Sequence, residues 1–165
     1  MCALPYIKPQ IKQIVILCGD VPLIKIDSIV SLLLKNWREG FDISVLCVEM
    51  ENPTGYGRII FGSNGNITDI VEESDATPEQ KKIKMINAGV YCINTDALKL
   101  FLNDLKPNNA QGEYYLTDII RAGNQMKKKV GFVSSLSADE IIGINDIETL
   151  QHVEKLMKVS SGKIS

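Results

Sequence analysis

A short apolar strand, a helix and a second apolar strand follow one another early in the chain, and this succession most constrains the fold. Ile14-Val15-Ile16-Leu17-Cys18 is an uninterrupted apolar run that ends at Gly19-Asp20, which predicts a strand buried on both faces. Apolar residues recur at helical spacing over 27–38, and residues 43–50 are apolar again. A strand, a helix and a strand at this spacing predict a parallel βαβ unit with a right-handed crossover.

Turn and capping signals divide the rest of the chain. Asp27 can cap the first helix and Gly40 can end it, while Thr77 with Gln80 predicts a short capped helix. The cluster 62–66, rich in Gly and Asn, predicts a hairpin turn because both residues tolerate positive φ angles. The sum is one α/β domain with a mixed, mostly parallel sheet. Its other expected elements are strands at 58–61, 67–73, 86–94, 130–134 and 140–144, and helices at 95–105, from about 117, and at 146–158.

The charge balance argues against general attraction to nucleic acid or an anionic membrane. The 165 residues suit one domain, and their formal net charge is -2. A phosphorylated ligand would therefore need local features such as a metal or amide-lined loops. No stretch is long enough to span a bilayer, and the first five residues lack the layout of a signal peptide, so we expect a cytoplasmic protein.

Cysteine and histidine usage argues against zinc and against a Cys-His catalytic pair. The chain contains four cysteines, none in a C-x-x-C pair, and a single histidine, His152, in a charged C-terminal helix. We expect His152 to face solvent and the cysteines to be buried, reduced thiols. The cysteines are Cys2, Cys18, Cys47 and Cys92.

Asp20 is the first residue of chemical interest, because ligands of parallel α/β sheets bind beyond the carboxyl ends of the strands. A single carboxylate there suits Mg²⁺, which binds through one or two protein oxygens together with substrate phosphates. The alternative is an Asp that caps a turn before Pro22. The glycine-rich loop Pro53–Arg58 is either a ligand-approaching loop or a tight connection between two strands.

Polar residues at three later places in the chain are further candidates. Glu72 and Glu73 end a hairpin strand on opposite faces, so at most one of them reaches a given cleft. Asn87 opens an apolar strand, where its amide either satisfies backbone groups or contacts a sugar. Asn145 follows another apolar run, and either it or Asp146 could cap the last helix.

The order of these segments closely resembles the uridylyltransferase domain of the bifunctional bacterial N-acetylglucosamine-1-phosphate uridylyltransferase/glucosamine-1-phosphate acetyltransferase family. The resemblance runs from about Ile14 to Leu156, between an unmatched lead at 1–13 and a tail at 157–165. Its segments are C-G-D-V-P-L at 18–23, N-P-T-G-Y-G-R-I at 52–59, I-V-E-E at 70–73, D-A-T-P-E-Q at 75–80, I-N-A-G at 86–89, N-N-A-Q-G-E-Y-Y-L-T-D at 108–118 and G-I-N at 143–145.

The resemblance implies a fold of the nucleotide-diphospho-sugar transferase type and a role for each matched residue. Asp20 and Asn145 would bind Mg²⁺, and Gly57 would offer its amide to the N-acetyl group of the sugar. Glu72 and Asn87 would hold the sugar. Cys18 and Gly19 would line the nucleotide pocket, although the family often has an aromatic residue at the Cys18 position. The ligands implied are N-acetylglucosamine-1-phosphate and UDP-N-acetylglucosamine.

One departure from the family pattern separates the possible functions. The family carries a G-x-G-T-x-M loop for the UTP phosphates, a following Lys and a Q-x-x-G-T-G segment for uracil, and none of these occurs in the 165 residues. We therefore expect an N-terminally truncated domain whose isolated chain transfers no uridylyl group. The alternatives are a non-catalytic module that binds a sugar phosphate or UDP-sugar, and one piece of a split enzyme. An unpaired edge at Ile14–Cys18 predicts self-association or pairing with a complementary N-terminal half.

Overall fold

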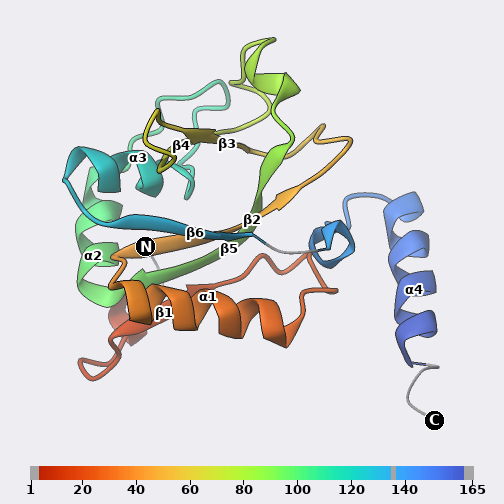
Figure 1. Cartoon of the computed structure of the whole chain (residues 1–165), viewed down its shortest axis with the longest axis horizontal. Helices are drawn as coiled ribbons and strands as arrows, with labels where there is room; N and C mark the ends of the chain where they lie inside the picture. The colour runs from red at the N-terminus through yellow and green to blue at the C-terminus, as the bar shows by residue number, and fades with distance from the viewer. Residues whose placement is uncertain (1–3, 135–136, 162–165) are drawn as a thin grey trace.

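The computed structural model describes residues 4–134 and 137–161, and its elements alternate in the α/β manner expected (Figure 1). The strands are β1 (Gln13–Ile16), β2 (Ile43–Glu49), β3 (Arg58–Phe61), β4 (Ile67–Val71), β5 (Met85–Asn94) and β6 (Val130–Ser134). The helices are α1 (Ile26–Glu39), α2 (Thr95–Asp104), α3 (Asp118–Gln125) and α4 (Ile147–Ser161), with short 3-10 helices η1 (Leu4–Tyr6), η2 (Gln80–Lys82) and η3 (Ala138–Ile141).

The sheet is mixed, as predicted, but it is mostly antiparallel rather than mostly parallel. Its order is β4-β3-β5-β2-β6, and β1 also pairs with β5. Long β5 runs antiparallel to β1, β2 and β3, and the β3–β4 hairpin is antiparallel because it turns directly on itself. Only β2 and β6 form a parallel pair among the described strands. A sequence pattern shows strands but not their neighbours, and β5 enters between strands that the pattern placed side by side.

The βαβ unit predicted at the start of the chain is therefore not a pair of adjacent strands. β1 and β2 lie on opposite edges of β5 and run in the same direction, each antiparallel to it. β1 is half-buried along its length instead of buried on both faces, because it lies at the margin of the sheet beside one end of β5. Its register with β5 aligns Ile14 with Ile93 and Ile16 with Tyr91.

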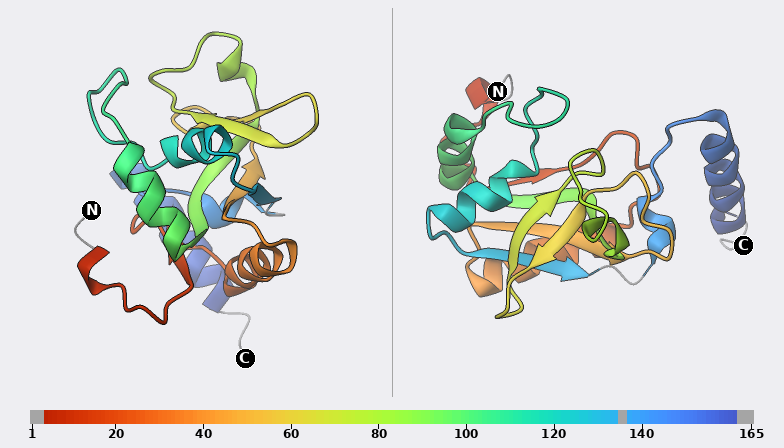
Figure 2. Two further views of the ribbon diagram at one scale, coloured as in Figure 1. Left: turned by 90° about the vertical axis from the view of Figure 1, so that its left-hand side faces the viewer. Right: turned by 90° about the horizontal axis from the view of Figure 1, so that it is seen from above.

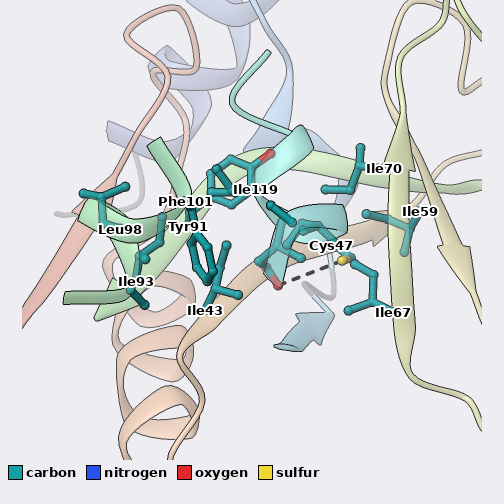
Figure 3. Packing of buried hydrophobic residues seen from close by; sticks show 14 residues of the cluster. Ile43, Cys47, Ile59, Ile67, Ile70, Tyr91, Ile93, Leu98, Phe101 and Ile119 are labelled. Atoms are coloured by element: carbon teal, nitrogen blue, oxygen red, sulfur yellow. Dashed lines mark hydrogen bonds between the residues drawn. The ribbon is translucent and has the colours of Figure 1, made fainter. Parts of the chain in front are cut away.

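Two hydrophobic cores cover the two faces of the sheet. Alternation along β2 places Ile43, Val45 and Cys47 in the core shared with α2 and α3, and Leu46 and Val48 in the core beneath α1. Figure 1 shows α1 below the strands and α3 above them, and the left view of Figure 2 also shows α1 apart from α2 and α3. Figure 3 shows the first core, where side chains from β2, β5, the β3–β4 hairpin and the two helices pack together. The result is three layers, with the loops gathered at the strand ends.

Gly40 ends helix α1 as expected, but the start of the helix differs from the prediction. Gly40 adopts the left-handed conformation at φ 64° and its N–H reaches the carbonyls of Asn36 and Trp37. Asp27 makes no cap, because the helix starts one residue earlier, after Lys25. Glu140 supplies the missing acceptor from a distant segment, since its carboxylate accepts from Lys25 N at 3.4 Å and Ser28 Oγ at 2.5 Å.

The prediction of a strand at 140–144 is also wrong, because this segment packs against α1 and does not pair with another described strand. Residues 138–141 form η3, which turns Glu140 toward α1 and buries Ile141 in the core beneath that helix. An apolar run shows that a segment is buried, but it does not show whether the backbone pairs with another strand. Here the burial comes from packing against α1.

The remaining expectations concern the C-terminal helix and the cysteines. α4 stands apart from the sheet in Figure 1, and His152 is exposed on it, as predicted. Cys47 and Cys92 are buried and free, but Cys18 is exposed, and Cys2 lies outside the described residues. Over residues 4–134 and 137–161, we find no helix with the length and apolar character needed to cross a membrane.

Candidate functional site

A cavity of about 320 Å³ opens where five loops and strand ends meet at one side of the sheet. The loop after β1, the loop between β2 and β3, the end of β4, the start of β5 and the segment after η3 all contribute to it. The lining residues are Cys18, Asp20, Val21, Gly55, Tyr56, Gly57, Glu72, Asn87, Ala88, Gly89, Ile141, Gly143 and Asn145. These segments are far apart in sequence, so the cavity is a product of the tertiary fold.

Most of the residues predicted for the site line this one cavity. Asp20, Gly57, Glu72, Asn87 and Asn145 are all part of its wall, and so is Cys18. Gly19 is the exception, because it lies in the same loop but does not line the cavity, and a side chain there would meet nothing within 4 Å.

Asp20 and Asn145 border the same space. A methyl group built onto Gly143 would lie 3.5 Å from Asp20 Oδ2 and 3.5 Å from Asn145 Nδ2. The Ile144 N–H donates to the Asp20 carbonyl oxygen at 2.9 Å, which fixes the two loops together. Rotation of the Asn145 amide brings its oxygen to the position of the nitrogen, since the two orientations differ only in hydrogen bonding.

The donors at this point fit Mg²⁺ better than a transition metal. A carboxylate and an amide oxygen are hard ligands of the kind that Mg²⁺ prefers, and Mg²⁺ keeps several waters or phosphate oxygens in its shell. Within the part of the chain that the structure describes, no three His, Cys, Asp or Glu side chains gather into a metal-binding group. A cation between Asp20 and Asn145 would therefore take most of its ligands from water and substrate.

Glu72 presents one carboxylate oxygen to the cavity beside Gly57. A side chain built onto Gly57 would lie 3.1 Å from Glu72 Oε2, so the glycine leaves this oxygen open. The other oxygen, Oε1, accepts a hydrogen bond from Thr117 Oγ1 at 3.0 Å. Burial raises the pKa of Glu72, and Thr117 opposes that rise by donating to the charged form.

The predicted strand 67–73 is too long, because β4 ends at Val71, but only Glu72 of the two glutamates lines the cavity, and Glu73 holds the glycine-rich loop. Buried Arg58 pairs with Glu73 Oε2 at 2.6 Å and also donates to the Tyr56 carbonyl, while the Gly55 N–H donates to Glu73 at 3.3 Å. Burial acts to raise the pKa of Glu73, but the bonds from Arg58, Gly55 and Lys81 outweigh it and lower the pKa. Arg58 and Glu73 thus fix the backbone that carries Gly57.

Asn87 and Cys18 meet at Gly89, where β5 bends. Asn87 Oδ1 accepts from the Gly89 N–H at 3.0 Å, and Cys18 Sγ donates to the Gly89 carbonyl at 3.4 Å. Gly89 has φ 71°, and a side chain there would lie 2.5 Å from Cys18 Sγ, so this position requires glycine. Burial, then the charges of Asp20 and Glu72, raise the pKa of the Cys18 thiol, which makes it a poor nucleophile near neutral pH.

Sequence reasoning missed Arg58, Thr117 and Tyr91. Arg58 was quoted only as part of a motif, and Thr117 had the pattern of an ordinary helix start. The Tyr91 hydroxyl is fully buried and has no hydrogen-bond partner among the described residues. Burial, then the charge of Glu72, raise the pKa of Tyr91. No local sequence signal marks a partner 45 residues away, as Thr117 is from Glu72.

Other hollows on the surface have a less coherent chemistry. A cavity of about 450 Å³ at the start of α2 is lined by Lys12, Lys99 and Lys128, but also by Asp42 and Asp96. Another of about 450 Å³ is lined by Leu102, Leu105, Tyr114 and Leu116. Although both are larger, neither gathers polar side chains from as many segments as the cavity around Asp20 does.

Comparison with known proteins identifies similar chains. The profile of the nucleotidyl transferase family matches residues 3–144. The bifunctional protein GlmU of Nitrosococcus oceani is 45% identical over 152 residues, which cover 92% of this chain and 33% of that protein. GlmU of Caldicellulosiruptor saccharolyticus is 42% identical over 163 residues, which cover 99% of this chain and 35% of that protein. This chain therefore spans about a third of the length of these relatives.

A solved structure supports the fold. The crystal structure of a putative glucose-1-phosphate thymidylyltransferase from Bacillus anthracis, in complex with a sucrose, matches with a TM-score of 0.70. The match covers 94% of this chain and 57% of that one at 19% sequence identity. At this identity the likeness establishes the nucleotide-sugar transferase type of fold and nothing finer.

Proposed function

Because the chain belongs to the nucleotidyl transferase family, we propose that its cavity binds a sugar 1-phosphate and the matching nucleotide-diphospho-sugar. The ligands proposed are N-acetylglucosamine-1-phosphate and UDP-N-acetylglucosamine. The resemblance of the segments around Asp20, Gly57, Glu72, Asn87 and Asn145 to the N-acetylglucosamine-1-phosphate uridylyltransferases supports this choice, and so does the similarity to the GlmU proteins.

The observation that carries the proposal is the convergence of those five residues on one cavity of about 320 Å³. This volume is at the small end of the range of about 300–1,000 Å³ for ligand pockets, which suits a monosaccharide phosphate. Glu72 offers an acceptor oxygen, Asn87 a side-chain amide and Gly57 a close backbone approach. Such a mixture of donors and acceptors matches sugar hydroxyl and N-acetyl groups.

The proposed metal is Mg²⁺, held by Asp20 and Asn145. When bound, it would neutralise charge on the phosphates of the ligand. The residues themselves place a carboxylate and an amide on either side of Gly143, and the bond from Ile144 to Asp20 keeps the spacing fixed. The side chains of Glu72 and Asn87 would orient the sugar in the same cavity.

The family reaction is the attack of a sugar 1-phosphate oxygen on the α-phosphate of UTP, with release of pyrophosphate. The 165 residues contain neither the G-x-G-T-x-M loop nor the Q-x-x-G-T-G segment, with which the family binds the UTP phosphates and uracil. We therefore propose that this chain alone binds ligand without transferring the uridylyl group. The absent glycine-rich loop also favours the second candidate function, a non-catalytic sugar-phosphate or UDP-sugar binding module, or one piece of a split enzyme.

Isothermal titration calorimetry with UDP-N-acetylglucosamine tests the binding. The expected result is saturable binding that strengthens on adding Mg²⁺, and loss of that Mg²⁺-dependent part in Asp20→Ala. Asp104→Ala is the matched control, because it removes the same charge from an exposed position at the end of α2, outside the cavity. If a folded sample gives no heat of binding either with or without Mg²⁺, that result contradicts the proposal.

A pyrophosphate-release assay tests the second part. The chain is mixed with UTP, Mg²⁺ and N-acetylglucosamine-1-phosphate, and no pyrophosphate is expected. Release above a protein-free blank would show that this chain is itself a transferase. The cytoplasmic location, the division into one partial domain with lead and tail, and the complementary partner or self-association all stay predictions.

A further inference from the structure

The position of the Glu72 carboxylate is set by one hydrogen bond from α3. Thr117 Oγ1 donates to Glu72 Oε1 at 3.0 Å, and this bond leaves Oε2 beside Gly57 at the cavity. Thr117 itself is buried, with 6% of its surface exposed, and it does not line the cavity. The donor therefore belongs to a residue that is not part of the cavity wall.

Thr117 also lies at a helix position where a hydroxyl normally bonds to the backbone of the first turn. It is the N-cap residue of α3, and a threonine there usually bonds to a backbone N–H of the first turn. In this structure the N-cap side chain makes no such bond, and its hydroxyl points to Glu72 across 45 residues of sequence. Helix α3 therefore lacks a side-chain cap, and the Thr117 hydroxyl bonds to the Glu72 carboxylate instead.

The groups that face Glu72 make this donor important. Burial is the largest influence on its pKa and raises it, and the carboxylates of Asp75 and Asp118 add to the rise. Thr117 is the strongest influence that lowers the pKa, ahead of the charge of Arg58. The other titratable groups coupled to Glu72 are Cys18 and Tyr91, whose own pKa values are raised. Without the Thr117 hydroxyl, little would favour the charged form.

We propose that Thr117 is a positioning residue that holds Glu72 as an oriented, ionised acceptor for a ligand hydroxyl. This inference rests on the proposed function for the role of the cavity, but the hold on Glu72 exists in the protein without ligand. Thr117 acts through Glu72 and contacts no ligand itself.

The first experiment follows Glu72 in the ligand-free protein. The chain is labelled with ¹³C at the glutamate carboxyl carbons, the Glu72 signal is assigned with Glu72→Gln, and its titration is recorded by NMR. Thr117→Val, which keeps the shape and removes the hydroxyl, is expected to raise the pKa of Glu72. Thr117→Ser, which keeps the hydroxyl, is expected to leave it near that of the unmodified protein. Equal pKa values in all three proteins would overturn the inference.

The second experiment measures UDP-N-acetylglucosamine binding as a function of pH. Because an ionised carboxylate is the stronger acceptor, binding is expected to weaken as the pH falls through the pKa of Glu72, and in Thr117→Val this weakening should begin at a higher pH. At pH 7 the loss is expected to be roughly tenfold, the effect of one hydrogen bond to a charged group, with Thr117→Ser restoring it. An unchanged affinity and pH profile in Thr117→Val would contradict the role in binding.

The two experiments separate failure of this inference from failure of the proposed function. If the unmodified chain binds no UDP-sugar, the proposed function fails, whereas the NMR titration still decides whether Thr117 controls Glu72. If Thr117→Val does not fold, Thr117→Ala takes its place, since it also lacks the hydroxyl and does not remove a helix cap bond. A merely structural threonine would lower the unfolding temperature without moving the pKa of Glu72.

Discussion

At the scale of single residues, the cavity depends on side chains that are absent as much as on those that are present. Gly143 leaves open the space between Asp20 and Asn145, and Gly57 leaves Glu72 Oε2 uncovered. Neither glycine has a positive φ, so the backbone at these positions would accept another residue. The requirement for glycine is then one of space, in contrast to Gly89, where conformation and contact with Cys18 both exclude a side chain.

Gly143→Ala tests whether the space beside this glycine is needed for the cation. The added methyl would lie in ordinary contact with Asp20 Oδ2 and Asn145 Nδ2, at 3.5 Å from each, and would fill the space proposed for the cation. We expect the Mg²⁺-dependent part of ligand binding to fall roughly tenfold or more, which corresponds to about 1.4 kcal/mol.

Calorimetric titration with and without Mg²⁺ measures the effect, and thermal unfolding checks that the protein is still folded. The Mg²⁺-free affinity is the internal control and should change little. Retention of the full Mg²⁺ effect in Gly143→Ala would show that the cation lies elsewhere.

At the scale of elements, Glu140 joins η3 to α1 and so helps to place Asn145. Its carboxylate accepts from Lys25 N, Lys25 Nζ and Ser28 Oγ, and it is 5% exposed. Burial acts to raise the pKa of Glu140, but the bonds from Ser28 and Lys25 outweigh it and lower the pKa. The exposed Lys25 ammonium adds little to stability, so the cap on the helix is the main effect.

Glu140→Gln is therefore expected to lower the free energy of unfolding by about 1–2 kcal/mol at pH 7. Because the folded pKa lies below the unfolded value, the stabilisation is present above the unfolded pKa and is lost as the pH falls through the folded one. The difference between variant and unmodified protein should shrink below about pH 4.

Urea unfolding at several pH values measures this difference. Glu148→Gln removes the same charge from an exposed position in the first turn of α4 and should cost little at any pH. A stability difference for Glu140→Gln that stays constant from neutral to acid pH would rule out the ionised cap.

At the scale of the whole molecule, the sheet is organised around β5. This strand pairs with β2 along one edge and with β1 and β3 along the other, so its side chains enter both cores. The strands at the margins are less protected: β1 is half-buried, and among the described residues no strand pairs with its second edge. The cavity lies where β5 begins, which attaches the candidate site to the strand that contributes to both cores.

Hydrogen exchange should follow this arrangement. The amides of Tyr91, Cys92 and Ile93 in β5 are expected to exchange at least about tenfold more slowly than those of Ile14 to Ile16 in β1, because opening a central strand requires more of the sheet to unfold. Exchange of intact protein followed by NMR measures both sets. Slower exchange in β1 than in β5 would indicate that its free edge is covered in solution, by a second copy or another chain.

Local patterns predicted most of the elements, although not the 3-10 helix at 138–141, and most of the residues that line the cavity. Helical spacing predicted α1 and α2, Gly and Asn predicted the β3–β4 turn, and Thr77 with Gln80 makes the reciprocal hydrogen bonds of the expected cap. The resemblance of short segments to a known family indicated six of the residues that line the cavity, which are Cys18, Asp20, Gly57, Glu72, Asn87 and Asn145. These features depend on neighbours within a few residues, and the sequence contains that information directly.

Only the tertiary structure decided which segments became neighbours. It placed β5 between β1 and β2, made Glu140 a cap for α1 where a strand was predicted, and left Gly19 outside the cavity. It also brought the Thr117 hydroxyl to Glu72. Each of these outcomes depends on packing and pairing between residues far apart in the chain. The free energy that decides them is a difference between whole arrangements of the sheet. The local sequence of one segment contains no information about that difference.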